Sequence, residues 1–297
     1  MKRLNQLTGH KGSIYALLMD PDGRHFYSAG GDGWIAHWPV TGAVDGKLVA
    51  EVDDQIFSIT LLARSKLLVA GTMSGNLYFI QPGSPSKTRN MTFHQKAVFD
   101  TMEVHEHLVC ASGDGRLSIW DIDNMTVSET ILLSHSALRT IDLSPNGQMM
   151  AVGSSDHSIY LLHVPSYRLI EELKDAHQSS VFCLQFSPDG RYLLSGGRDA
   201  HLNLWDLGSF DLQQSIPAHW YTINALRYRP ERSEVVTVSR DKTIRRWTEP
   251  ELQIRQTLDF AQHQGHSASV NQVCWSMDGR ILLTAGDDNT IIRWHND

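Results

Sequence analysis

Apolar and polar residues alternate with a period of two along most of the chain, in short runs separated by turns rich in Gly, Asp and Pro. Residues 181–207, VFCLQFSPDGRYLLSGGRDAHLNLWDL, contain three such runs in succession. This alternation is typical of antiparallel β-strands. The segments SPDG, SPNG and SMDG predict hairpin turns, in which Pro fixes φ and Gly accepts a positive φ. Because no stretch shows a convincing helical period, the pattern predicts an all-β fold.

The alternating runs belong to an internal repeat that occurs seven times and fills the chain. Aligned on the turn residue before an Ile- or Leu-rich run, successive copies are 42, 40, 42, 43, 42 and 47 residues apart. The turn residues are Asp32, Ser74, Asp114, Asp156, Asp199, Asp241 and Asp288. Six positions further on lie Trp38, Ile80, Trp120, Leu162, Trp205, Trp247 and Trp294. A period of this length indicates a repeat architecture.

Each copy holds four short strands, and one such sheet cannot bury both of its faces alone. A closed ring of seven four-stranded antiparallel sheets buries them all. We therefore expect one domain over residues 1–297. The last copy ends just after its third strand, and residues 2–8 can supply its outer strand, which would remove an open sheet edge.

The ends of the copies resemble the WD-repeat β-propeller family, and the likeness covers essentially the whole chain. A copy in that family runs from Gly-His to Trp-Asp. The first dipeptide or a close variant occurs at Gly9-His10, Ala176-His177, Ala218-His219 and Gly265-His266, and the second at Trp120-Asp121 and Trp205-Asp206.

The resemblance implies a hydrogen-bonded chain of His, a strand Ser or Thr, the turn Asp and the Trp indole inside a blade. By matching positions, these residues are His10, Ser28, Asp32 and Trp38 in copy one; His177, Ser195, Asp199 and Trp205 in copy five; His219, Thr237, Asp241 and Trp247 in copy six; and His266, Thr284, Asp288 and Trp294 in copy seven. The set recurs at fixed spacing, whereas an active site is needed once. We therefore interpret it as structural.

Three copies depart from this pattern. Copy two has Asp54, Ala70, Ser74 and Ile80; copy three has Cys110 at the hydroxyl position; copy four has Val152 and Leu162. We expect packing alone to hold these copies. Two further histidines, His94 and His135, are assigned to the repeat as well.

Charge and cysteine content narrow the class of protein. The chain has 26 Lys and Arg against 33 Asp and Glu, a net charge of −7, which argues against a protein whose main role is to hold nucleic-acid phosphate. No leader-like apolar segment or long apolar span occurs, so a cytoplasmic protein is expected. Cys110, Cys183 and Cys274 form no CxxC pair and predict buried free thiols.

Candidate chemistry is sparse. The sequence contains no P-loop, GxSxG, HExxH, EF-hand loop or CxxC pair, so we expect no enzyme, no cofactor and no metal site. His105 and His107, two residues apart, could chelate a metal, but no third ligand is identifiable. We interpret them as residues of an exposed loop.

Two columns of the repeat predict a partner-binding surface. The position five residues after the His slot, which the resemblance places at the rim of the top face, holds Tyr15, Phe57, Phe99, Arg139, Phe182, Asn224 and Asn271. The position before the turn residue holds Gly31, Met73, Gly113, Ser155, Arg198, Arg240 and Asp287. Aromatic and Arg side chains are favoured at interface hot spots, although aromatic residues in a strand can also simply fill core.

The sequence thus predicts a non-catalytic scaffold whose top face binds a peptide or loop with acidic and apolar side chains. The protein is expected to be a monomer or one member of a hetero-complex, with no membrane partner. The alternatives are a nucleic-acid or ribosome-associated adaptor and a propeller enzyme with a channel site. The first draws on eight basic residues between Arg227 and Arg255, which five acidic residues including Glu231 offset. Besides the top face, the link into copy seven is a candidate for contact with a partner, because it is longer than the links between the other copies.

Overall fold

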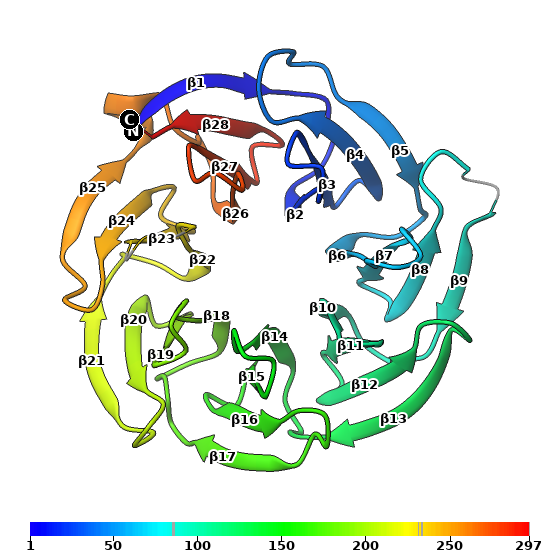
Figure 1. Ribbon diagram of the computed structural model, residues 1–297. Helices are drawn as coiled ribbons and strands as arrows, with labels where there is room; N and C mark the ends of the chain where they lie inside the picture. Colours follow the sequence, from blue (N-terminus) through cyan, green and yellow to red (C-terminus); the bar gives the residue numbers. More distant parts are fainter. Residues whose placement is uncertain (85–86, 231, 233, 297) are drawn as a thin grey trace.

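The computed structural model describes residues 1–84, 87–230, 232 and 234–296 as seven four-stranded antiparallel sheets around a central channel (Figure 1). The predicted seven-bladed β-propeller is confirmed. From the channel outward, blade one holds β2 (Ile14–Met19), β3 (His25–Gly30), β4 (Trp34–Pro39) and β5 (Lys47–Glu51); blade two holds β6 (Ile56–Leu61), β7 (Leu68–Thr72), β8 (Asn76–Ile80) and β9 (Arg89–Thr92); blade three holds β10 (Val98–Val104), β11 (His107–Ser112), β12 (Arg116–Asp121) and β13 (Thr126–Leu132).

The remaining blades repeat this order. Blade four holds β14 (Leu138–Leu143), β15 (Met149–Ser154), β16 (Ile159–His163) and β17 (Leu169–Leu173); blade five holds β18 (Val181–Phe186), β19 (Tyr192–Gly197), β20 (His201–Asp206) and β21 (Leu212–Pro217); blade six holds β22 (Ile223–Tyr228), β23 (Glu234–Ser239), β24 (Ile244–Thr248) and β25 (Ile254–Leu258); blade seven holds β26 (Val270–Trp275), β27 (Ile281–Gly286), β28 (Ile291–His295) and β1 (Lys2–Leu7).

The N-terminal strand closes the ring, as the sequence predicts. β1 pairs antiparallel with β28, so the two ends of the chain lie side by side in blade seven (Figure 1). Leu7 at the end of β1 is 1% exposed and packs in the core between blades seven and one. The N-terminal amine also donates to Gln256 Oε1 of blade six at 2.9 Å.

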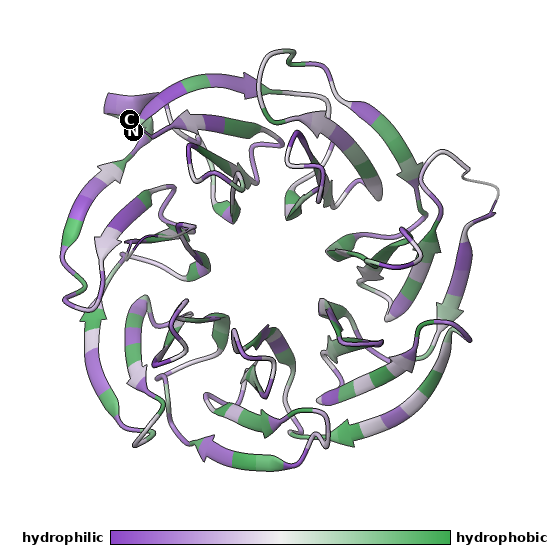
Figure 2. Cartoon of the chain, in the orientation of Figure 1, coloured by the Kyte–Doolittle hydropathy of each residue, from purple (hydrophilic) through white to green (hydrophobic). Residues whose placement is uncertain are grey.

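The hydrophobic core is divided into seven clusters, each of which spans two neighbouring blades. The second strand of each blade is almost wholly buried, whereas outer strands such as β13 and β21 alternate between exposed and half-buried residues. Figure 2 shows the same contrast as mixed polar and apolar colours on the outer strands. Since every cluster needs two blades, no blade can bury its faces alone.

The four hydrogen-bonded chains that the resemblance implies are present in blades one, five, six and seven. In blade six, the Trp247 indole N–H donates to Thr237 Oγ1 at 2.8 Å, and His219 Nε2 lies 2.7 Å from the same oxygen. His219 Nδ1 lies 2.9 Å from Asp241 Oδ2. A carboxylate only accepts, so Nδ1–H donates to Asp241. The Thr237 hydroxyl accepts from the indole, and Nε2 is the one described acceptor within reach of its own proton, so the hydroxyl donates to Nε2. The histidine is therefore neutral.

The electrostatics of these chains agree with a neutral His and an ionised Asp. Burial lowers the pKa of His219, and of the equivalent His94 in blade three, by more than the Asp partner of each raises it. Burial also acts to raise the pKa of the Asp carboxyls, but the hydrogen bonds that they accept from the His N–H and from backbone N–H groups lower the pKa by more. The pKa is therefore lowered in Asp32, Asp114, Asp199, Asp241 and Asp288.

Blade three corrects the expectation that packing alone holds it. His94 Nδ1 lies 2.9 Å from Asp114 Oδ2, and His94 Nε2 lies 2.8 Å from Ser118 Oγ, which also accepts from the Trp120 indole at 2.8 Å. The hydroxyl therefore comes from β12 instead of β11. Ser118 stands directly opposite Cys110 in the register, so the same point in space receives an oxygen from the neighbouring strand.

Blade four also has a polar chain, contrary to expectation. Ser134, one residue earlier than expected, takes the histidine position and donates to Asp156, which also accepts from Tyr160 Oη at 2.7 Å. His135, which was assigned to the repeat, is instead exposed. In blade two the matching position is Val52, a buried apolar residue, and not Asp54, whose side chain accepts from the Ser74 backbone N–H.

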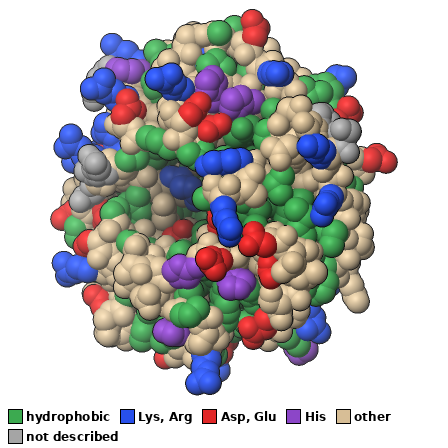
Figure 3. Space-filling view, turned by 45° about the vertical axis from the view of Figure 1, so that its right-hand side comes forward, with side chains coloured by type: hydrophobic (Ala, Val, Ile, Leu, Met, Phe, Trp, Pro, Cys, Tyr) green, Lys and Arg blue, Asp and Glu red, His purple; other side chains and the backbone are tan. Residues whose placement is uncertain are grey.

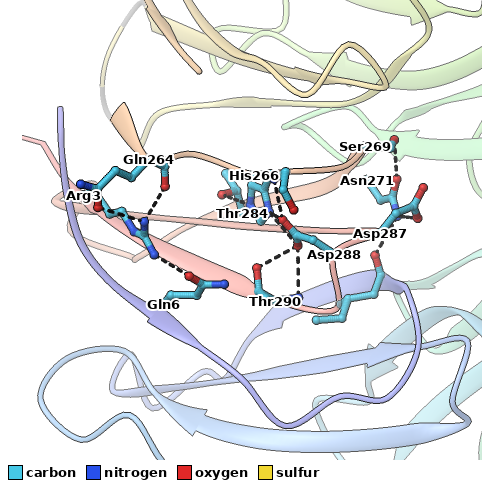
Figure 4. Close-up of polar contacts among 12 residues, drawn as sticks. Arg3, Gln6, Gln264, His266, Ser269, Asn271, Thr284, Asp287, Asp288 and Thr290 are labelled. Carbon is cyan, nitrogen blue, oxygen red and sulfur yellow. Dashed lines mark hydrogen bonds and ion pairs between the residues drawn. The ribbon is translucent and has the colours of Figure 1, made fainter. Parts of the chain in front are cut away.

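The link into blade seven contains the one helix of the described residues, α1 (Phe260–His263), whose N-cap Asp259 accepts from the Gln262 backbone N–H. Arg3 of β1 donates to the carbonyl of Gln264, just after α1, at 2.6 Å (Figure 4). The longer link is thereby fastened to the strand that closes the ring.

Candidate partner-binding face

A β-bulge near the start of the innermost strand of every blade creates the candidate site. In blade one Ile14 pairs with Gly30 and Ala16 with Ala29, so Tyr15 has no partner in the ladder. The same register shift occurs in the other six blades and leaves one residue of each without a ladder partner: Phe57, Phe99, Arg139, Phe182, Asn224 and Asn271. A bulge turns a side chain out of the regular pleat. The seven predicted rim residues are therefore presented together where the channel opens on the top face, the face that carries the turns before each third strand.

Five of these seven side chains form a continuous row around the channel mouth. The ring centroids of Tyr15 and Phe57 are 5.0 Å apart, and those of Phe57 and Phe99 are 5.4 Å apart. The Arg139 guanidinium lies 4.2 Å from the Phe99 centroid and 5.3 Å from that of Phe182. A cation over an aromatic face at this distance is an attractive contact. The aromatic and cationic parts of the predicted surface are thus one stacked unit.

The two asparagines complete the ring with polar contacts. Asn224 Nδ2 donates to the Val270 carbonyl at 2.8 Å, and Asn271 Nδ2 donates to the Ile14 carbonyl at 3.2 Å, which joins blade six to seven and seven to one. Asn271 also donates to Asp287 at 2.7 Å (Figure 4). These two predicted binding residues therefore have bonds within the protein that hold neighbouring blades together.

The residues before the turns divide into small and charged types. A side chain at Gly31 or Gly113 would lie against the ring of Tyr15 or Phe99, so glycine leaves room for the aromatic row. Met73 is exposed. Arg139 Nε donates to Ser155 Oγ at 2.9 Å.

Positive charge gathers at blades four to six. Burial, together with repulsion from Arg198, lowers the pKa of Arg139. Within the described part of the chain, no ion pair involves Arg139, Arg198 or Arg240. This part of the face therefore carries cations that no internal carboxylate neutralises.

The bulge residues surround a cavity of about 490 Å³ that continues down the channel. Figure 3 shows the hollow from one side, with Lys or Arg side chains at its edge and apolar side chains around it. Three carboxyl residues line this space, Asp100, Glu103 and Asp142. Asp100 accepts from the Ile141 backbone N–H and Asp142 from that of Phe186, so each of these two ties its blade to the next. Burial raises the pKa of Asp100 to about 6 and that of Asp142 to about 7, despite the opposing effect of Arg227.

The replacement Asp142→Asn should raise the melting temperature by a few degrees at pH 8 and change it little at pH 4. A carboxyl whose pKa is raised on folding stabilises the fold while protonated, and this contribution is lost as pH rises through about 7. The amide oxygen can still accept from Phe186. Thermal unfolding at both pH values measures the effect. Asp189→Asn is the control: its pKa is lowered by Ser187, so it should show no gain at pH 8. A lower melting temperature for Asp142→Asn at pH 8 would contradict the assignment.

The other candidate chemistry of the sequence has structural explanations. His105 is exposed in the turn between β10 and β11, and His107 begins β11. Among the described residues, no group of three or more His, Cys, Asp or Glu side chains is placed to hold a metal ion. The three cysteines are free; Cys110 and Cys183 are buried and Cys274 is half-buried. Burial raises the pKa of all three thiols, to about 12 in Cys183 and about 11 in Cys274.

Several basic residues of blade six have partners inside the protein. Arg229 and Arg246 both pair with the buried carboxylate of Glu234, and Arg245 donates to the Ala218 carbonyl at 2.7 Å. Glu231, one of the interleaved acids, lies outside the described residues. The basic run is therefore partly an internal network of the blade.

Two side chains of this face were not predicted from the sequence. Trp220 and Tyr221, in the link between β21 and β22, are 79% and 61% exposed, the highest values among the large hydrophobic side chains. A comparison of the seven copies could have predicted them, because the matching positions in the other six copies contain no Phe, Tyr or Trp.

A WD domain, G-beta repeat model matches residues 1–39, 127–162, 168–206, 210–248 and 257–295, and the chain belongs to this family of β-propellers. The crystal structure of the WD40 β-propeller domain of Doa1 superposes with a TM-score of 0.86 over 100% of this chain and 97% of that chain, at 16% sequence identity. WD40 propellers generally serve as protein-interaction scaffolds and are typically non-catalytic.

Three sequence relatives share between 21% and 27% identity with this chain. Protein tipD of Dictyostelium discoideum is 22% identical over 99% of this chain and 48% of its own length. Autophagy-related protein 16 of Arabidopsis thaliana is 21% identical over 98% of this chain and 57% of its own length, and COMPASS component SWD3 of Saccharomyces cerevisiae is 27% identical over 59% and 57%. The chain thus spans about half the length of these relatives. In the described ranges, no helix has the length and apolar character needed to cross a membrane.

Proposed function

We propose that this propeller is a non-catalytic scaffold that binds an extended peptide or loop of a partner protein on its top face. The observation that carries the proposal is the row Tyr15, Phe57, Phe99, Arg139 and Phe182 around an open cavity. Aromatic and Arg side chains contribute large contact areas and charge-assisted hydrogen bonds to interfaces. The row offers apolar surface, and the cations beside it attract carboxylates.

Charge complementarity supports an acidic and apolar partner segment. Arg139 and Arg198 repel each other and form no ion pair with a described residue, so a carboxylate between them would remove the repulsion. The name of one relative, a COMPASS component, describes a member of an assembly, which supports a scaffold role. We further propose a monomer or hetero-complex member of the reducing cytoplasm, in keeping with its three unpaired cysteines.

The double substitution Phe99→Ala and Arg198→Glu should abolish retention of top-face partners while the fold persists. The substitution removes one ring of the row and reverses one charge. Proteins that co-purify with the full chain are identified by mass spectrometry, and the binding of each is then measured with purified components. The control is Arg64→Glu, an exposed arginine in the turn between β6 and β7 at the opposite face. Retention of every partner by the double variant, with unchanged melting of the protein, would refute the proposal.

A further inference from the structure

The link between β21 and β22 holds an exposed aromatic pair on a fixed backbone. The Trp220 backbone N–H donates to Asp241 Oδ2 at 3.1 Å, and the Tyr221 carbonyl accepts from Ser239 Oγ at 3.1 Å. The side chains have no such ties: Trp220 is 79% and Tyr221 is 61% exposed, and neither ring stacks on another described aromatic ring or cation. Because hydrogen bonds already fix the backbone of this link, a partner that binds the two rings loses little affinity to the conformational entropy of ordering the link.

The repeat shows that the fold does not require these aromatics. The residue after the histidine position is Lys11, Asp53, Gln95, His135, Gln178 and Ser267 in the other blades, and each is exposed. The residue after that is Gly12, Asp54, Lys96, Ser136, Ser179 and Ala268. The backbone bond to the turn Asp is the same in blades one, three, five and seven, where the residue is polar. Four other copies thus build the same bonded link without an aromatic pair, and the remaining two also lack one.

Two exceptional arginines flank the pair. Only blades five and six carry Arg before the turn residue, at Arg198 and Arg240. The turn that follows Arg198 is bonded to the link, because the Ala200 carbonyl accepts from the His219 N–H at 3.2 Å. On the other side, the Arg240 N–H donates to the Thr222 carbonyl at 3.0 Å. The backbone at Arg240 and the turn that follows Arg198 are therefore both bonded to the link that carries Trp220 and Tyr221, so the two arginines lie on either side of it.

We infer that Trp220, Tyr221, Arg198 and Arg240 form a second anchor for an acidic partner peptide, which places an aromatic or leucine side chain on Trp220 and flanking carboxylates on the two arginines. Trp, Tyr and Arg are the residue types most enriched at interface hot spots. Arg198 lies between this anchor and the channel mouth, because its backbone N–H donates at 2.9 Å to the carbonyl of Ser180, two residues before the bulge residue Phe182. The inference rests on the proposed function, because the same partner segment would run from the row of aromatic residues and Arg139 at the channel mouth to the link between β21 and β22.

Charge favours a peptide over a nucleic acid as the occupant. Exposed aromatics with Arg also suit a single nucleic-acid strand, whose bases stack on such rings. A strand with one phosphate per base needs a long cationic track, however, and the chain carries a net charge of −7. Two arginines match the few carboxylates of a short acidic segment better than a polyanion.

The test selects peptides of about a dozen residues from a random display library on the immobilised full chain. Selected peptides should carry an aromatic or leucine residue between Asp or Glu residues. The variant Trp220→Ser with Tyr221→Ala installs the Ser-Ala pair of blade seven, and should weaken binding about tenfold or more. The variant Arg198→Ser with Arg240→Ser installs the serine of blade four and should reduce the salt dependence of binding. Both should melt like the wild type.

Phe260→Ser is the matched control, because Phe260 is an exposed aromatic in the link of the next blade; it should not change binding. Peptides that lose affinity with Phe99→Ala but not with the Trp220 variant would overturn this inference and leave the proposed function standing. Selected peptides insensitive to both variants, or no selected peptides, would overturn both. Binding of an oligouridylate that requires Trp220, with no acidic peptide that does, would replace the peptide by a nucleic-acid strand.

Discussion

Removal of residues 1–8 is expected to lower the melting temperature by about 10 °C or more and to make the protein self-associate. β1 is the outer strand of blade seven, and its loss exposes the unpaired backbone groups of β28. It also removes Leu7 from the core between blades seven and one, a loss of about 2 kcal/mol by itself. Together with the lost strand pairing, several kcal/mol correspond to a shift of this size in a chain of this length.

Thermal unfolding and size-exclusion chromatography of the truncated chain measure these two effects. Self-association is expected because a bare strand edge is a template for pairing with a second chain. Two point variants separate packing from pairing: Leu7→Ala should destabilise, whereas Leu4→Ala, at a position that is 50% exposed in the same strand, should not. A truncated protein that remains monomeric and melts like the full chain would show that the ring does not depend on this strand.

The repeat explains why so much of this fold could be predicted from sequence. A fixed spacing places equivalent residues at equivalent points in every blade, so the column predicted for the rim, from Tyr15 to Asn271, contains the residue that the structure places at the bulge of every blade. The alternation of period two identified the strands, and the missing fourth strand of the last copy indicated the role of β1. The strands and the closure of the ring follow from counting along the chain, whereas the place of the rim column follows from the family resemblance.

The errors arose where neighbouring strands exchange roles. In blade three the hydroxyl moved from the position of Cys110 to Ser118, its cross-strand partner, and in blade four Tyr160 stands opposite Val152. Linear spacing does not show such a move, because the two positions are close in space only after the strands pair. The Asn224 and Asn271 contacts to the next blade were missed for the same reason.

The sequence alone marks the Trp220 link, because the residue after the histidine position is Trp in copy six and polar in the other six copies. Within a repeat, six copies serve as a control for the seventh. A residue type that one copy has and the others lack is not needed for the shared geometry. Exposed exceptions such as Trp220 are therefore better candidates for function than buried ones such as Ser118, which restores a structural bond.

The second large effect is expected from Asp241→Ala, which should reduce the free energy of unfolding by about 3 kcal/mol. Asp241 accepts from His219 Nδ1, the Trp220 backbone N–H and Thr243 Oγ1. Alanine leaves the buried His219 N–H without its acceptor, and a buried unsatisfied donor costs about 1 to 3 kcal/mol alone. Urea unfolding measures the change. Asp22→Ala is the control, because Asp22 also accepts several hydrogen bonds but is exposed in a hairpin.

The pH dependence of this variant tests the charge state of the chain of hydrogen bonds. The pKa of Asp241 is lowered in the folded protein, so the ionised carboxylate stabilises the fold at any pH above the ordinary value of 3.8, and this stability is lost as pH falls further. The pKa of His219 is also lowered, so its neutral form is retained as pH falls through 6.5. The difference between wild type and Asp241→Ala should therefore stay constant from pH 8 to pH 6 and narrow only near and below the ordinary pKa of the carboxyl. A difference that grows as pH falls from 8 to 6 would mean that His219 takes up a proton in the fold with Asp241 as its partner, and the assignment of a neutral, hydrogen-bonded histidine would be wrong.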